Sequence, residues 1–281
     1  MKKKNTNLTK MDMLVHLLVK VNNDDIFALA SQLAYYLALS FFPFIIFLTN
    51  LISFTNIDSN AAINGLQSIL PQSVWELTSS IVKEVLDSQS QGLLWFSIIL
   101  AIWTSSSGFR AVIKVINKAY DVDVKEQKSF ITITISAYIW TLVLGLTILG
   151  ALLLLVFGDI IGKYLISVLP FKHIVLIIWD VLRNGLSIVI LIFVFASMYK
   201  YTVSLKLRWR DVLPGAIVSS IGWVAVSYMF AFYINNFANY SRFYGSLATV
   251  FVLMIWLFLT AIIFLFGVEI NSVIMKNSTK K

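Results

Sequence analysis

The chain has 281 residues, of which 59% are hydrophobic and 13% are charged, whereas an average soluble domain carries roughly 25% charged residues. So few charges cannot cover the surface of a water-soluble protein of this length, which excludes an ordinary soluble globular protein. Lys and Arg outnumber Asp and Glu by 22 to 14, giving a net charge of +8, and the absence of Cys excludes disulfides, zinc–thiolate sites and thiol nucleophiles.

Six mainly apolar runs are long enough to cross a bilayer, which takes about 20 residues in a helix. They predict an all-α, polytopic membrane protein. The expected spans cover approximately residues 31–54, 92–113, 130–157, 174–199, 212–234 and 246–275. Residues 1–30 then form a cytoplasmic N-terminal segment, 31–275 the transmembrane domain and 276–281 a cytoplasmic tail.

The first span has a start signal and an internal proline. Asn22, Asn23, Asp24 and Asp25 are helix-capping residue types directly before Ile26, so the helix is expected to begin in the cytoplasm. Pro43, in the middle of the span, removes a backbone hydrogen bond and predicts a kink.

Residues 55–91 form the long connection on the opposite side of the membrane. Apolar residues recur there at helical spacing after Pro71, which predicts an extracytoplasmic amphipathic helix. The helix could lie on the outer leaflet with Trp75 as an interfacial anchor, or cover the mouth of the bundle. Simple packing on the outer ends of the spans is the third alternative.

The cations are distributed unevenly between the two sides of the six predicted spans. Seventeen of the 22 fall in residues 1–20, 110–128, 200–210 and 276–281, four fall in the opposite segments, and Arg183 lies within the fourth span. Because Lys and Arg in short loops stay on the cytoplasmic side, both termini are expected in the cytoplasm. The scattered cations predict no nucleic-acid binding. They either attract anionic lipid at the cytoplasmic face or only fix the topology.

The fourth span carries Asp180, Arg183 and Asn184. Asp180 and Arg183 are three residues apart and so share one helix face, and Arg183 lies close to the expected midplane. A charged residue at that depth must face protein or water. We therefore expect a substrate-binding site for an anion or head group, with Arg183 attracting the charge. The alternative is an ion pair that locks the helix into the bundle.

A second candidate group lies near the cytoplasmic ends of the first and last spans. Gln32, Tyr36, Glu269 and Asn271 are expected at similar depth, where they would line a substrate-binding vestibule. Alternatively, Glu269 pairs with one of the cytoplasmic cations. The small residues in 105–108 and 215–220 indicate close helix packing.

Several strings, taken in order, resemble the YihY/BrkB family of bacterial inner-membrane proteins. They are Gln32-Leu33-Ala34-Tyr35-Tyr36 with Ser40-Phe41-Phe42-Pro43, Trp103-Thr104-Ser105-Ser106-Ser107-Gly108, Asn117-Lys118-Ala119-Tyr120-Asp121-Val122, Pro214-Gly215-Ala216, Tyr244-Gly245-Ser246 and Gly267-Val268-Glu269-Ile270-Asn271. The resemblance implies a six-span inner-membrane protein, with members tied to serum resistance and to export of an envelope lipid. The family has also carried the label ribonuclease BN, but the two isolated histidines here give no metal-ligand cluster for such chemistry.

The residues and the resemblance together favour a transporter or flippase for an anionic amphiphile or envelope lipid. The alternative is a non-transporting membrane scaffold for envelope machinery. We expect no enzymatic activity, no metal and no cofactor, because the chain offers no nucleophile–base or metal-ligand constellation. Membrane lipids are the expected partners, and homo-oligomerisation is left open.

Overall fold

The computed structural model describes residues 10–54, 91–123, 125, 127–147, 150, 172–237 and 247–278, together with scattered residues between 63 and 84. Within these ranges the chain is helical and contains no strand. The helices are α1 (Lys10–Asn23), α2 (Ile26–Phe54), α5 (Gln91–Ala119), Phe130–Thr147, α7 (Lys172–Thr202), α8 (Trp209–Phe237) and α10 (Leu247–Ser278). The all-α prediction is confirmed.

Four helices in the described residues are both long and apolar enough to cross a membrane. Their candidate spans are Ile26–Phe47, Phe130–Thr147, Trp209–Ile234 and Val250–Lys276. α5 and α7 coincide with the other two predicted spans and contain 29 and 31 residues. Six spans therefore stay a prediction, whereas a helical membrane protein with several spans is what the structure shows.

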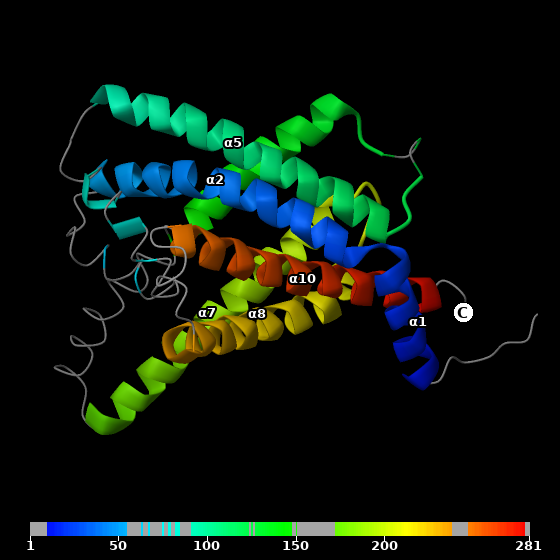
Figure 1. Ribbon diagram of the computed structural model, residues 1–281. Coiled ribbons are helices and arrows are strands. Elements are labelled where there is room, and N and C mark those ends of the chain that lie inside the picture. Colours follow the sequence, from blue (N-terminus) through cyan, green and yellow to red (C-terminus); the bar gives the residue numbers. More distant parts are fainter. Residues whose placement is uncertain are drawn as a thin grey trace, which may run out of the picture.

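α10 occupies the centre of the bundle (Figure 1). It packs against α2 on one side and α8 on the other, while α5 covers α2 and α7 covers α8. Buried residues from all of these helices form one continuous apolar core. The helix Phe130–Thr147 contacts α2, where Gly145 lies against the Phe44 and Phe47 rings.

α8 and α10 approach closely at two glycines. A Cβ built on Gly267 would lie 1.9 Å from Ser219 Oγ, and one built on Gly215 would lie 2.0 Å from the Gly267 carbonyl oxygen. The Tyr199 hydroxyl of α7 lies at the same place between α8 and α10. It hydrogen-bonds to Ser219 Oγ at 2.9 Å and to the Phe264 carbonyl oxygen at 2.8 Å. The close packing predicted for residues 215–220 is confirmed.

α1 is not among the predicted elements, and it lies across one end of the bundle (Figure 1). The polar residues read as a cap for the first span instead form a corner between two helices. Asp25 has a φ of 58°, and the Asp25 N–H donates to the Asn22 carbonyl oxygen at 3.2 Å. Asp tolerates this left-handed conformation better than most residues, so the chain turns sharply before Ile26 starts α2.

α5 ends in a related way. The Val122 N–H donates to the Asn117 carbonyl oxygen, and the Asp121 N–H donates to the Lys118 carbonyl oxygen. Asp121 itself has a φ of 52°, in the left-handed region. This is the Schellman arrangement, which satisfies the last carbonyl groups of a helix. It also fixes the position of the Asp121 carboxylate beside the ends of α1 and α10.

Four cation-bearing segments meet at one end of the bundle, which we call the basic end: α1, residues 110–128, residues 200–210 and the end of α10. The Lys118 ammonium donates to the Asp24 carbonyl oxygen at 3.0 Å, and Asn117 Oδ1 accepts the Ser204 N–H at 2.9 Å. The charge distribution predicts that this end faces the cytoplasm.

The predicted amphipathic helix in residues 55–91 lies mostly outside the described residues. Of the residues described there, Trp75 and Val82 are buried and Lys83 and Glu84 are exposed. Of the three alternatives, the burial of Trp75 favours packing against the bundle over an anchor on the outer leaflet. The helix itself stays a prediction.

Candidate functional site at the basic end

A buried charge pair joins α1 to α10. Glu269 is 1% exposed although it lies on the apolar helix α10, and Lys20 is 7% exposed. The Lys20 ammonium lies 3.0 Å from Glu269 Oε2. Charged groups taken out of water are costly unless they are paired, so the contact explains how Glu269 is accommodated at this depth. Pairing of Glu269 with a cation is the alternative that the sequence offers to a role in the vestibule.

The pair belongs to a cluster of three carboxylates and two ammonium groups. Lys20 also pairs with Asp24, and its ammonium lies 3.8 Å from Asp121 Oδ2. Asp121 in turn pairs with Lys276 at the end of α10. Burial alone would lower the pKa of Lys20, but the Asp24 and Glu269 carboxylates outweigh it and raise that pKa above its usual value. The cluster therefore holds Lys20 in its charged form.

Asn271 faces α8 and completes its backbone hydrogen bonds. Its Oδ1 accepts the Gly215 N–H at 2.7 Å, and its Nδ2 donates to the Val212 carbonyl oxygen at 3.0 Å. Pro214 lies between these two residues inside α8, where a proline lacks an N–H and disturbs the helix. The carbonyl that loses its usual donor is that of Arg210, four residues before the proline. Asn271 binds backbone groups on either side of Pro214 and so ties this turn of α8 to α10.

Replacing Asn271 by Ala is expected to lower the free energy of unfolding by about 2–4 kcal/mol, because two buried backbone groups lose their partners. The measurement is unfolding of the purified protein in mixed micelles, followed by helical circular dichroism. Asn236→Ala is the control: Asn236 is exposed near the other end of α8 and donates only to the Phe232 carbonyl oxygen. Equal effects of the two substitutions would contradict the assigned role of Asn271.

The other two residues of the predicted vestibule, Gln32 and Tyr36, lie on α2. Gln32 is exposed on α2, and Tyr36 is half-buried with its ring 5.6 Å from that of Tyr35. Among the described residues, no hydrogen bond or ion pair joins Gln32 or Tyr36 to Glu269 or Asn271. The vestibule formed by these four residues stays a prediction.

Asp180, Arg183 and Asn184 lie on α7. Their side chains fall outside the part of the chain that the structure describes. The substrate-binding role of these residues stays a prediction.

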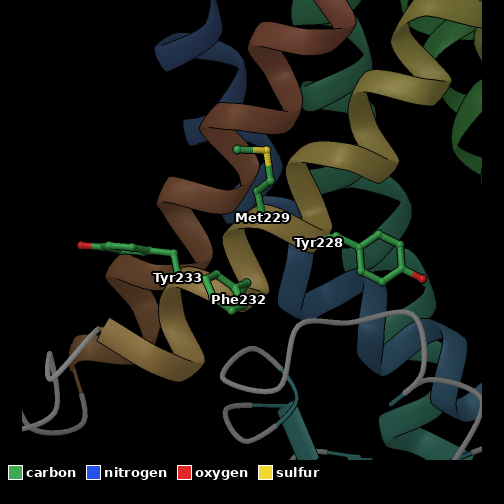
Figure 2. A pocket seen from close by; sticks show the side chains of 4 residues that line it. All are labelled: Tyr228, Met229, Phe232 and Tyr233. Atoms are coloured by element: carbon green, nitrogen blue, oxygen red, sulfur yellow. The ribbon is translucent and has the colours of Figure 1, made fainter.

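A shallow apolar hollow of ≈ 500 Å³ lies elsewhere, on α8, lined by Tyr228, Met229, Phe232 and Tyr233. Figure 2 shows the four side chains spread along this one helix and not converging on a common centre. All four are exposed. Such a surface suits contact with lipid chains, and none of the predicted site residues lines it.

The chain matches the family model described as virulence factor BrkB over residues 17–281. It belongs to the BrkB family. The ribonuclease-like protein YfkH of Bacillus subtilis is 38% identical over 247 residues, covering 88% of this chain and 89% of YfkH. A UPF0761 membrane protein of Coxiella burnetii is 25% identical over 254 residues, covering 87% of this chain and 86% of the relative. No solved structure matches.

Membership of the BrkB family confirms the resemblance drawn from the ordered strings. The relatives named UPF0761 are named membrane proteins, in agreement with the apolar helices found here. The names BrkB and UPF0761 state no reaction, and the ribonuclease-like name belongs to YfkH.

The most connected residue of the site, Lys20, is not among the predicted site residues of this BrkB protein. Its one sequence signal is Asp24, four residues later and therefore on the same helix face. Nothing in the sequence pairs Lys20 with Glu269 in particular, because that contact depends on how α1 crosses α10.

Proposed function

We propose that this BrkB protein moves an anionic amphiphile, such as an envelope lipid, across the membrane. The observation that carries the proposal is the burial of Glu269 in a helix apolar enough to span a bilayer. Ionisable residues in membrane spans are costly and mark substrate or ion pathways by default. Glu269 is paired with α1, which lies outside the candidate spans, so its partner can separate from it without the bundle unpacking.

Buried hydroxyl groups on the central helices add support. Ser220 Oγ on α8 and Thr260 Oγ1 on α10 are buried and have no hydrogen-bond partner among the described residues. Unsatisfied polar atoms are rare in protein interiors and require an explanation. Water or polar groups passing along α8 and α10 in another conformation would satisfy them.

We infer that α1 closes the basic end in the conformation described here. α1 crosses the end of the bundle (Figure 1), and Lys20 holds it to α10 through Glu269. Transporters alternate between states open to one side or the other. Separation of Lys20 from Glu269 would open the basic end. Arg183, predicted within the fourth span, would attract the anionic group of the substrate on its way through.

The proposal is tested in proteoliposomes that contain a trace of fluorescent phosphatidylglycerol, with dithionite bleaching to measure movement between leaflets. The protein is expected to accelerate movement of this lipid over protein-free liposomes, and to act far less on fluorescent phosphatidylcholine. Arg183→Ala is expected to abolish the acceleration while the protein stays folded, whereas Arg183→Lys should retain part of it.

Rates equal to those of protein-free liposomes for both lipids would contradict transport and favour the scaffold. In that case, pull-down with the intact basic end should recover a partner that is lost when Lys200, Lys206, Arg208 and Arg210 are neutralised. An Arg183→Ala protein that is folded and moves lipid at the wild-type rate would contradict the role of Arg183.

A further inference from the structure

Lys200, at the basic end of α7, is surrounded by aromatic rings. Its ammonium lies 4.6 Å from the centre of the Tyr201 ring and 4.7 Å from the centre of the Trp209 ring. The Phe193 ring stacks on Trp209 with their centres 5.6 Å apart, and Trp140 lies 6.4 Å from Tyr201. Ring faces attract a cation, so they hold the Lys200 ammonium in place without neutralising it.

A second cation, Lys128, contacts the backbone of the same tyrosine, Tyr201. Its ammonium donates to the Tyr201 carbonyl oxygen at 3.0 Å, and its backbone N–H donates to Ser204 Oγ at 3.2 Å. Burial lowers the pKa of Lys128 below its usual value. Among the described residues, no carboxylate lies within ion-pair distance of Lys128 or Lys200. The two ammonium groups are therefore positioned by neutral partners and left without an anion.

The surroundings of this lysine pair are those of a membrane interface. Phe130 is 75% exposed next to Lys128, Phe193 is 60% exposed, and Tyr201 is 50% exposed. Aromatic residues with one polar edge gather where hydrocarbon meets water. The pair therefore lies where the apolar flank of the bundle meets the basic loops, at the level of lipid head groups.

We propose that Lys128 and Lys200, which both contact Tyr201, bind the phosphate of an anionic phospholipid. The two ammonium groups contact the phosphate, while the exposed rings contact the glycerol region and upper acyl chains. The apolar surface beside the lysines is the reason to assign a lipid and not free phosphate. This site is distinct from the Glu269 cluster, and it does not depend on transport.

The test is native mass spectrometry of the full chain released from detergent with added phosphatidylglycerol or phosphatidylcholine of the same acyl chains. Each ammonium near a head group is worth about fivefold in affinity, so Lys128→Gln/Lys200→Gln should lose about 25-fold in phosphatidylglycerol binding. The matched control is Lys125→Gln/Lys206→Gln, which removes the same charge from two exposed lysines within the same two cation-bearing segments, 110–128 and 200–210. The control should bind as the wild type does.

Equal losses in the two double variants would overturn the proposal, because the binding would then follow overall charge. Displacement of phosphatidylglycerol by millimolar inorganic phosphate would overturn the assignment to a lipid. Lys128→Arg/Lys200→Arg keeps both charges and is expected to keep binding. Lys200→Gln alone leaves the Lys128 contacts intact and should lower the affinity for phosphatidylglycerol about fivefold. This single variant replaces the double variant if the latter fails to fold.

Discussion

Replacing Lys20 by Gln is expected to lower the free energy of unfolding by about 3–5 kcal/mol, the range for breaking a buried ion pair by removing one partner. The substitution leaves the Glu269 carboxylate buried and brings it into uncompensated repulsion with Asp24 and Asp121. Glu269→Gln is expected to cost only about 1 kcal/mol, since Lys20 keeps Asp24 as a partner and the amide still accepts a hydrogen bond. Both changes in the free energy of unfolding are measured by unfolding the protein in mixed micelles with increasing dodecyl sulfate.

The double variant Lys20→Gln/Glu269→Gln is the control for this asymmetry. Once neither buried charge is left unpaired, it should recover most of the stability lost in Lys20→Gln. Equal costs for the two single substitutions, or a double variant no more stable than Lys20→Gln, would contradict the central position of Lys20 in the cluster.

Gly267→Ala is expected to destabilise the protein by about 3 kcal/mol or more, at or above the upper end of the usual range for overpacking. The added methyl group would lie 1.9 Å from Ser219 Oγ, 2.7 Å from the Gly215 carbonyl oxygen and 2.8 Å from the Tyr199 hydroxyl oxygen. A backbone carbonyl cannot rotate away as a side chain can, so α8 and α10 must separate. The expected result is a lower midpoint of unfolding and a reduced yield of monodisperse protein.

Gly222→Ala, on the facing helix α8, is the matched control. Its Cβ would meet the Ile263 side chain at 3.1 Å, and that flexible chain can move by a few tenths of an ångström. The gain in helix propensity, about 1 kcal/mol, offsets the crowding, and near wild-type stability is expected. A Gly267→Ala protein as stable as Gly222→Ala would show that α8 and α10 do not approach as closely as described.

The sequence predicts the long helices because a run of about 20 apolar residues can cross a membrane in few conformations other than an α-helix. α7, α8 and α10 begin and end within a few residues of the expected spans. α1 is missed because it is short and amphipathic. Its last residues carry the same polar types that would cap α2, and a corner with Asp25 in a left-handed conformation cannot be told from a cap by composition.

Only part of the candidate site can be predicted from the sequence, for a related reason. Depth along a helix follows from counting residues, but rotation about its axis depends on packing. Gln32 therefore turns out exposed, while Glu269, on a helix covered on both sides, is buried. The partners of Asn271 are backbone groups of another helix, α8, and the partner of Glu269 depends on the crossing of α1 over α10. Each is a tertiary contact without a local signal.

The central claim, that α1 must leave α10 for an anionic amphiphile to cross, can be tested directly because the natural chain contains no Cys. Lys20→Cys/Glu269→Cys removes both charges together and can be bridged by a reducible bifunctional thiosulfonate reagent. Movement of fluorescent phosphatidylglycerol, measured by extraction of the outer leaflet with albumin so that no reductant is present, is expected to stop when the bridge forms and to resume when the bridge is reduced. Within each single Cys variant, the same treatment should leave the rate of lipid movement at that variant's own untreated value. Undiminished lipid movement with the bridge in place would contradict the claim.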